Sequence, residues 1–203
     1  MKISGISKAF KYTVGTSMLA GALLISNPKT NAKTQDVFVH SQEIPPKGTS
    51  DPMTLLWAPN PQVTVAGQQH FATIVVDLKN NILYKYDQNG KATEAYLVAS
   101  GASKTPSTPG LKAVSHIESY PYKSAASTTK RYKKPNDYGP RIICLETVDP
   151  TNNERGITGE FIHGNNNPAS LGKHASKGCI RMDNEVIKKL AKEVKRGDFV
   201  LVL

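Results

Sequence analysis

The spacing of short apolar segments and turn residues in the middle of this chain constrains its fold most. Three β-branched or aromatic segments, Phe71–Asp77, Ile82–Tyr86 and Glu94–Ala99, are separated by Asn80–Asn81 and Asn89–Gly90. β-Branched and aromatic residues favour strands, while Asn and Gly adopt the backbone conformations that tight turns require. The pattern therefore predicts three consecutive strands in an antiparallel meander.

The rest of the chain beyond this meander also favours strands. Four further segments have the same composition: Lys112–Ile117, Arg141–Val148, Glu160–His163 and Phe199–Leu203. One amphipathic helix is expected to begin at Asn184, which caps it, and to stop before Gly197. Its apolar stripe consists of Val186, Ile187, Leu190, Ala191 and Val194. We therefore expect a mainly β domain with one or two short helices.

The first residues have the composition of an export signal. Three lysines, Lys2, Lys8 and Lys11, precede an uncharged segment whose apolar centre is Ser17–Ile25. That centre is shorter than the roughly 18 to 20 residues that span a bilayer, which favours a cleaved signal peptide over 1–32. An uncleaved anchor remains the alternative, and it would be the chain's only contact with a membrane. A Pro-, Lys- and Ser-rich linker is expected over 33–66, and the globular domain over 67–203.

The charge of the chain narrows the choice of partner. The formal net charge is +10, and the lysines outside the signal segment are scattered along the chain. A basic surface suits polyanions, including the anionic polymers and carboxylate-rich peptides of a cell wall. Because export to the periplasm or cell envelope is expected, nucleic acid is the least favoured of these partners.

The two cysteines differ sharply in their surroundings. Cys144 lies in the apolar segment Arg141–Leu145, where a thiol acts as a small core side chain. Cys179 follows a glycine in a cationic loop, and His163 lies upstream as a partner that could make thiolate available. In an extended segment Lys177, Cys179 and Arg181 would share one face. A Cys144–Cys179 disulfide or two buried thiols remain open alternatives.

Six segments, taken in order, resemble the L,D-transpeptidase catalytic domain family (YkuD-type). They are Ile74–Asp87, Ser100–Gly101, Thr105–Gly110, Phe161–Gly164, Ser176–Arg181 and Lys195–Val202. The resemblance covers roughly Phe71 to Leu203. It implies a β-sandwich-like fold, and an enzyme that cross-links or trims bacterial peptidoglycan. Six segments in the family's order are a far more specific signal than an isolated Cys/His pair.

The resemblance also implies roles for individual residues. Cys179 matches the nucleophile and His163 the general base, while the backbone carbonyl of Gly164 would orient the imidazole. Gly178 and Cys179 would direct backbone N–H groups at the oxyanion. Neither metal nor organic cofactor is required. A zinc site made of Cys179, His163 and His174 is also disfavoured, because the spacing fits no common zinc pattern and a fourth ligand is lacking.

One departure from the family pattern concerns the residue two places before the nucleophile. The usual Ser/Thr-His-Gly-Cys is here Ser176–Lys177–Gly178–Cys179, so the second family histidine is replaced by lysine. If that histidine tunes the site, Lys177 can stabilise thiolate by its charge; if it transfers protons, a lysine does so poorly at neutral pH. Further candidates for substrate contact are Ser176, Lys177, His174, Tyr138 and, for a substrate carboxylate, Arg181.

The expected reaction is thioester acyl transfer on peptidoglycan tetrapeptide stems. An amine of another stem would give a 3-3 cross-link, a lysine of an envelope protein would give an anchored protein, and water would give L,D-carboxypeptidase activity. The sequence does not select among these acceptors. The rival interpretation is a non-catalytic peptidoglycan-binding module that has kept the fold, and Lys177 is the feature that favours it.

Overall fold

The computed structural model describes residues 44–120 and 135–203. The predicted signal segment and the first part of the predicted linker lie outside the described residues. Among the helices that are described, none has the length and hydropathy needed to cross a membrane.

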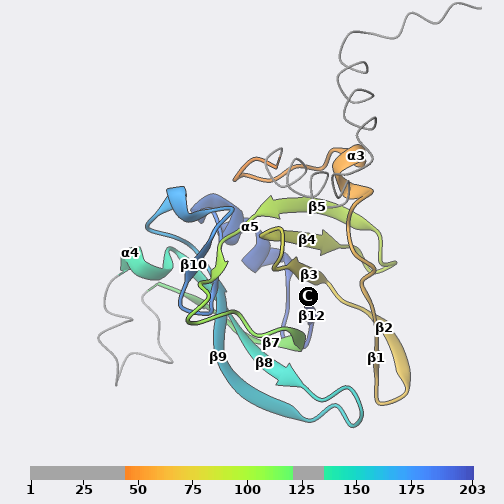
Figure 1. Cartoon of the computed structure of the whole chain (residues 1–203). Helices are drawn as coiled ribbons and strands as arrows, with labels where there is room; N and C mark the ends of the chain where they lie inside the picture. The colour runs from red at the N-terminus through yellow and green to blue at the C-terminus, as the bar shows by residue number, and fades with distance from the viewer. Residues whose placement is uncertain (1–43, 121–134) are drawn as a thin grey trace, which may run out of the picture. The chain divides into compact units, whose positions relative to one another are not determined.

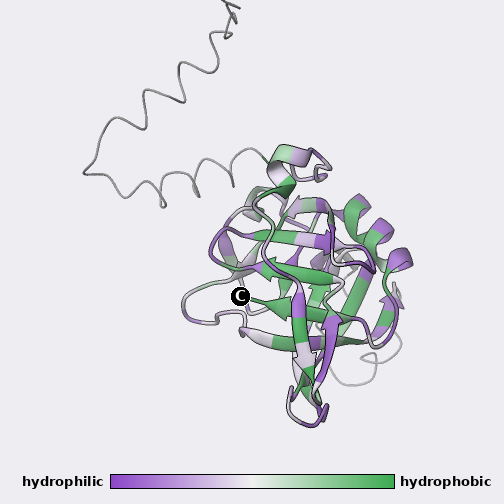
Figure 2. Cartoon of the chain, turned by 90° about the vertical axis from the view of Figure 1, so that its right-hand side faces the viewer, coloured by the Kyte–Doolittle hydropathy of each residue, from purple (hydrophilic) through white to green (hydrophobic). Residues whose placement is uncertain are grey.

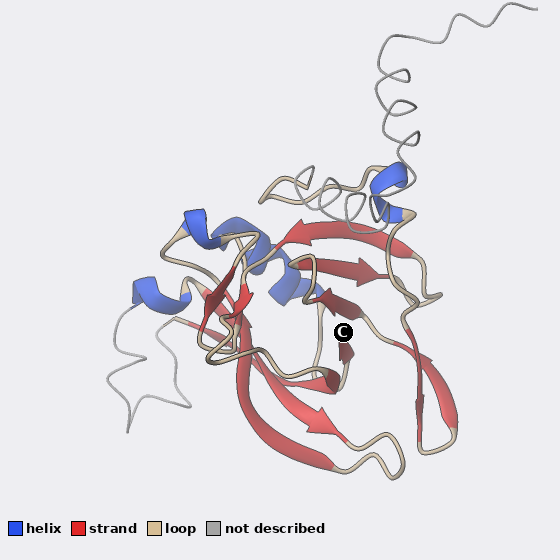
Figure 3. Cartoon of the chain, viewed as in Figure 1, coloured by secondary structure: helices blue, strands red, loops and turns tan. Residues whose placement is uncertain are grey.

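One curled sheet of eight strands forms the centre of the domain (Figures 1 and 3). Its strands are β3 (Ile74–Asp77), β4 (Ile82–Tyr86), β5 (Ala92–Leu97), β7 (Gly110–Ser119), β8 (Arg141–Val148), β9 (Arg155–His163), β11 (Ile180–Arg181) and β12 (Phe199–Val202). Their order across the sheet is β11-β9-β8-β7-β12-β3-β4-β5. The prediction of a mainly β fold with few short helices is confirmed.

The predicted meander is present as β3, β4 and β5, which pair antiparallel in sequence order. Asn81 between β3 and β4 has φ 54°, and Gly90 between β4 and β5 has φ 75°. Both values lie in the left-handed region that Asn and Gly tolerate best. The last strand, β12, lies between β7 and β3 and runs parallel to β3. The C-terminal segment thus completes the centre of the sheet.

Apolar side chains of the central strands are buried on both faces of the sheet (Figure 2). Successive residues of β3 illustrate this: Ile74 and Val76 belong to one buried cluster, and Val75 to the other. The first cluster includes the apolar side of helix α5 (Asn184–Glu193). The second cluster includes Ile44, Val63 and Val65. A one-residue shift in register would exchange the two sets of side chains.

Helix α5 has the predicted apolar stripe, but its cap differs from the prediction. The N-cap is Asp183, whose carboxylate accepts hydrogen bonds from the backbone N–H groups of Glu185 and Val186 at 2.8 and 3.2 Å. Asn184 is the first helical residue, and its side chain contacts the β9 end instead. The helix also stops early, because Val194 is already extended with φ −94° and ψ 154°.

Replacing Asp183 with alanine should destabilise the domain by about 1 kcal/mol, the usual cost of losing an N-cap. The Asp183 carboxylate accepts two backbone N–H groups that have no other partner within the helix. Denaturant unfolding would measure the loss, with Asp183→Asn as the control that keeps a capping oxygen. A loss as large in Asp183→Asn as in Asp183→Ala would contradict the capping explanation.

Part of the segment expected as linker packs against the domain. The hairpin of β1 (Gln62–Val65) and β2 (Gln68–Phe71) turns at Ala66–Gly67, and the short helix α3 (Pro52–Leu55) precedes it. Ile44 is only 2% exposed. A Cβ on Gly48 would lie 2.2 Å from the ring of Tyr96, so the backbone passes directly over that side chain. The ordered domain therefore begins earlier than residue 67.

Most of the remaining short elements contain or lie near the segments that carry the family resemblance. A separate parallel pair joins β6 (Ser100–Gly101) to β10 (His174–Ser176). Helix α4 (Pro135–Tyr138) precedes β8, and the 3-10 turn η2 (Pro168–Ser170) follows β9. The pairing of β6 with β10 and the parallel pairing of β11 with β9 bring segments distant in sequence to one edge of the large sheet.

Candidate active site

Cys179 occupies a tight loop between β10 and β11. Ser176 closes this loop: its hydroxyl accepts from the Gly178 N–H at 3.1 Å and donates to the Cys179 carbonyl at 2.5 Å. Gly178 has φ 113°, a left-handed conformation that an L side chain rarely adopts. Cys179 is left partly exposed. The loop therefore presents the thiol from a backbone fixed by its own hydrogen bonds.

Two expectations for this loop do not hold in the structure. The Gly178 N–H, expected at the oxyanion, already donates to Ser176, and Ser176, expected to contact substrate, is 2% exposed. The alternation expected for Lys177, Cys179 and Arg181 is interrupted at Gly178, so the strand begins only at Ile180. The side chain of Lys177 is exposed. The positive φ of Gly178 introduces the turn that interrupts the alternation.

His163 ends β9, and its neighbour in the parallel strand β11 is Arg181. Its Nδ1 lies 2.6 Å from the Gly164 carbonyl oxygen, the contact that the sequence led us to expect. A carbonyl oxygen only accepts hydrogen bonds, so Nδ1 carries the proton and Nε2 is the nitrogen that can take one up. The imidazole is 3% exposed.

The surroundings of His163 keep the imidazole neutral. Burial lowers its pKa from 6.5 to about 3, and the charge of Arg181 acts in the same direction. Hydrogen bonds with the backbones of Gly164 and Tyr138 oppose this shift in the pKa. At neutral pH the ring is therefore in the form that accepts a proton.

Acidification should destabilise the domain through His163. The unfolded chain binds a proton at this ring below about pH 6.5, whereas the folded chain does so only near pH 3. The His163 contribution to the free energy of unfolding is complete above about pH 6.5 and is lost progressively as the pH falls toward 3. Urea unfolding at pH 7 and pH 5 would measure this, and His163→Asn should lose less stability than the wild type. Equal losses would refute the assignment.

Aromatic and apolar side chains enclose the imidazole. The Tyr138 ring centroid lies 4.6 Å from that of His163 and 6.3 Å from that of Phe161. Tyr138 is 8% exposed and belongs to a small buried cluster with Ile142 and Cys144. Tyr138, expected to contact substrate, is therefore placed to hold the imidazole in position by packing.

Asn184 is the residue beside the site whose role sequence reasoning missed. Its Oδ1 accepts from the Asn165 N–H at 2.8 Å, and its Nδ2 donates to the Asn165 carbonyl at 3.1 Å. A Cβ on Gly139 or Gly164 would lie 2.4 Å from Asn184 Oδ1. These close approaches hold the turn that carries the Gly164 carbonyl. The signal in the sequence was the presence of glycine at 139 and 164, which leaves space for the Asn184 amide. Local capping rules had instead predicted that this amide caps helix α5.

Arg181 has hydrogen-bonding capacity left among the described residues. Its Nη1 lies 3.5 Å from the Ala175 carbonyl, and its buried Nε has no partner there. The backbone of Arg181 is held by two hydrogen bonds with Ala99. A guanidinium suits a carboxylate, because two of its N–H groups can bind both oxygens.

His174 belongs to a different set of contacts. Its Nδ1 lies 2.8 Å from the Ser100 hydroxyl, which also donates to Asn81 Oδ1 at 2.6 Å. His174 and Ser100 line a pocket of about 640 Å³. A second pocket, of about 740 Å³, is lined by Arg141, Asn165 and Asn166, beside the turn that follows His163. The structure thus supplies a recess near the candidate base and another beside β6.

Cys144 is a core residue. Both cysteines are free in the structure, so the disulfide alternative is excluded there. Burial, followed by the charges of Glu118 and Cys179, raises the pKa of the Cys144 thiol to about 12. Within the described ranges, the ligand atoms of His116, Glu118 and Cys144 lie within 4.8 Å of one another. A thiol that stays protonated is a poor metal ligand, since metals bind the thiolate.

Comparison with known proteins identifies the family of this domain. A family model described as "L,D-transpeptidase catalytic domain" (YkuD) matches residues 72–202. The chain belongs to this family. Over 41 residues it is 56% identical to YkuD of Bacillus subtilis (strain 168) and 51% identical to YkuD of Bacillus licheniformis, both named as L,D-transpeptidases. Each of these matches spans 20% of this chain and only 25% of the relative.

Solved structures are also similar to this L,D-transpeptidase domain. Bd1075 of Bdellovibrio bacteriovorus has a TM-score of 0.50 and 21% identity, over 71% of this chain and 52% of that one. The catalytic domain of the Enterococcus faecium L,D-transpeptidase acylated by ertapenem has a TM-score of 0.44 and 28% identity, over 68% of this chain and 100% of that one. The similarity to Bd1075 is one of fold.

Proposed function

We propose that this chain is an exported cysteine L,D-transpeptidase that acts on peptidoglycan tetrapeptide stems. Membership of the L,D-transpeptidase family supports a transpeptidase, and that family acts on peptidoglycan stem peptides. The observation that supports the cysteine mechanism is the neutral, buried imidazole of His163. Its Nδ1–H donates to the Gly164 carbonyl, and His163 lies at the end of β9, next to β11. The N-terminal segment supports export to the periplasm or cell envelope.

In the proposed mechanism Cys179 gives its proton to His163 Nε2, and the thiolate sulfur adds to the carbonyl of the third stem residue. A C–S bond forms and the carbonyl electron pair moves onto oxygen. When that intermediate collapses, the C–N bond to the terminal D-alanine breaks, and its nitrogen takes the proton from His163. An amine acceptor then attacks the thioester and restores the thiol. Burial and the charge of Arg181 keep the imidazole neutral until the thiol gives up its proton.

Arg181 is proposed as the site for a substrate carboxylate. Its backbone is held to Ala99, and its guanidinium keeps a buried, unpaired Nε within the described residues. Tetrapeptide stems carry free carboxylates, which a guanidinium can bind in two places at once. Lys177, whose side chain is exposed, would add positive charge at the mouth of the same site.

Product analysis distinguishes the three reactions and the non-catalytic rival. The domain would be incubated with a tetrapeptide stem as donor and with three acceptors in turn: a second stem, a lysine-containing peptide, and water alone. Release of D-alanine with a 3-3 linked dimer identifies a cross-linking enzyme, and an isopeptide product identifies an anchoring enzyme. D-alanine release without a coupled product identifies a carboxypeptidase. No D-alanine release in any mixture would contradict the enzyme and leave the binding module.

A further inference from the structure

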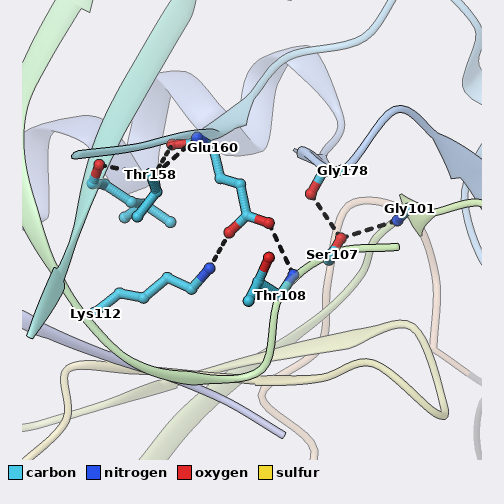
Figure 4. Close-up of polar contacts among 8 residues, drawn as sticks. Gly101, Ser107, Thr108, Lys112, Thr158, Glu160 and Gly178 are labelled. Carbon is cyan, nitrogen blue, oxygen red and sulfur yellow. Dashed lines mark hydrogen bonds and ion pairs between the residues drawn. The ribbon is translucent and has the colours of Figure 1, made fainter. Parts of the chain in front are cut away.

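The carbonyl of Gly178 is held by a residue from another part of the chain. Ser107 Oγ lies 2.7 Å from Gly178 O and 2.9 Å from Gly101 N (Figure 4). A backbone N–H can only donate, so the Ser107 hydroxyl accepts from Gly101 and its single proton must be donated to Gly178. Ser107 is 5% exposed, which shields this contact from water.

This contact fixes the orientation of the peptide that joins Gly178 to Cys179. A trans peptide is planar, and its C=O and N–H point in opposite directions. Because the Gly178 carbonyl points at Ser107, the Cys179 N–H is directed away from Ser107. The Gly178 N–H cannot serve the oxyanion, since it donates to Ser176 at 3.1 Å. The backbone donor whose direction the fold sets is therefore that of Cys179 itself.

A buried ion pair anchors the segment that carries Ser107. Lys112 Nζ contacts Glu160 Oε2, and Glu160 Oε1 accepts from the Thr108 N–H at 2.8 Å (Figure 4). Lys112 is 2% exposed, and burial lowers its pKa only to about 8, so it remains charged at pH 7. The pair holds Thr108, and with it Ser107, in place, and the Lys112 ammonium also interacts electrostatically with Cys179.

Close packing at Gly101 confirms that the segment has little freedom. A Cβ at this position would lie 2.3 Å from both Ser107 N and Thr105 O, distances that real Cβ atoms do not show. The backbone of Gly101 therefore lies directly against the turn that contains Thr105 and Ser107. Displacement of Ser107 would require movement of this strand or of Glu160.

We propose that Ser107 is a positioning residue of the oxyanion site: its hydrogen bond to Gly178 directs the Cys179 N–H at the carbonyl oxygen under attack. This inference rests on the proposed function, since it requires Cys179 to be the nucleophile. Lys112 and Glu160 contribute by fixing the backbone next to Ser107. Without the Ser107 hydroxyl the Gly178–Cys179 peptide can rotate about ψ of Gly178, because a residue without a Cβ has the fewest steric limits on its backbone angles.

Two reactions of Cys179 separate positioning of the N–H from reactivity of the thiol. Alkylation by iodoacetamide needs thiolate but forms no oxyanion, whereas acylation by a carbapenem passes through one. In that acylation the sulfur adds to the lactam carbonyl, the ring C–N bond opens and the nitrogen takes a proton, so the adduct has the mass of the whole drug. Both rates would be measured by mass spectrometry at the Cys179 peptide, at pH 7 and with equal protein.

Ser107→Ala should slow carbapenem acylation by about 10- to 100-fold, somewhat less than the loss of an oxyanion donor itself. Alkylation by iodoacetamide should change by less than roughly twofold, because the thiol and His163 are untouched. Ser107→Thr, which keeps the hydroxyl, should recover most of the acylation rate. Ser103→Ala, an exposed serine of the same loop, is the matched control and should behave as the wild type in both reactions.

The remaining outcomes each decide a different point. Unchanged acylation in Ser107→Ala would overturn the positioning role, and an equal fall in both rates would do so too, because it would show general damage to the site. Glu160→Gln is the second variant if Ser107→Ala does not fold, and it should also slow acylation more than alkylation. Absence of any carbapenem adduct on wild-type Cys179 would instead refute the proposed function.

Discussion

Replacing Cys179 with alanine should abolish covalent addition of a carbapenem, measured as the mass increase of the intact protein. The thiol is the group that would attack the lactam carbonyl, and alanine offers no nucleophile in its place. Cys144 cannot substitute for it, because burial raises its pKa to about 12 and little thiolate exists at neutral pH. The adduct should therefore fall below detection at any incubation time used for the wild type.

Two further variants make this result specific. Cys144→Ala removes the other thiol and should still form the adduct at Cys179. His163→Ala should slow addition by about 10²- to 10⁴-fold, the usual contribution of a general base. His116→Ala is the matched histidine control, since His116 is exposed and pairs with Glu118 on β7. An adduct that survives in Cys179→Ala, or one unaffected by His163→Ala, would contradict the proposed roles.

Replacing Lys112 with methionine should destabilise the domain by about 3 kcal/mol, the largest effect that we expect from a single charged residue. The change keeps most of the aliphatic volume but leaves the Glu160 carboxylate without its cation. The Glu160 side chain is only 15% exposed, so water can compensate little of that loss. Denaturant unfolding at pH 7 would measure the difference in the free energy of unfolding.

Lys189→Met is the matched control for this experiment. Lys189 also contacts a carboxylate, with Nζ 2.8 Å from Glu94 Oε1, but its side chain is 52% exposed. An exposed pair of this kind contributes less than about 1 kcal/mol. If Lys112→Met cost no more than Lys189→Met, the Lys112–Glu160 pair would not anchor the segment that carries Ser107.

Much of the fold followed from local patterns. Strands β4 and β8 have the bounds that their apolar segments predicted, because the turn residues on either side interrupt the hydrogen bonds between strands. Helix α5 was found from its apolar stripe, yet its cap was misplaced by one residue, since Asp183 and Asn184 are both good caps. Short strands such as β6 and β11 were not predicted, because two residues carry no periodicity.

The candidate site could be predicted only in part. Cys179 and His163 were predicted as site residues from residue type and order, and the contact of His163 with the Gly164 carbonyl, which the structure shows, from the resemblance to the family. Ser176 and Gly178 were assigned to the substrate or oxyanion, but their polar groups bind each other in the structure. A serine hydroxyl can accept a hydrogen bond from the backbone N–H two residues later. The sequence does not show whether the Ser176 hydroxyl and the Gly178 N–H bind each other or the substrate.

The sequence by itself determined the mainly β class and the β3-β4-β5 meander, and it suggested the Cys/His pair, because these depend on neighbouring residues and on the types of side chain. Only the tertiary structure decided how the backbone at Cys179 is oriented. Ser107 and Gly178 are 71 residues apart, as are Thr105 and Ser176, and their hydrogen bonds exist only once β6, β10 and β11 have come together. Contacts of that separation depend on how the sheet closes, and no local propensity encodes them.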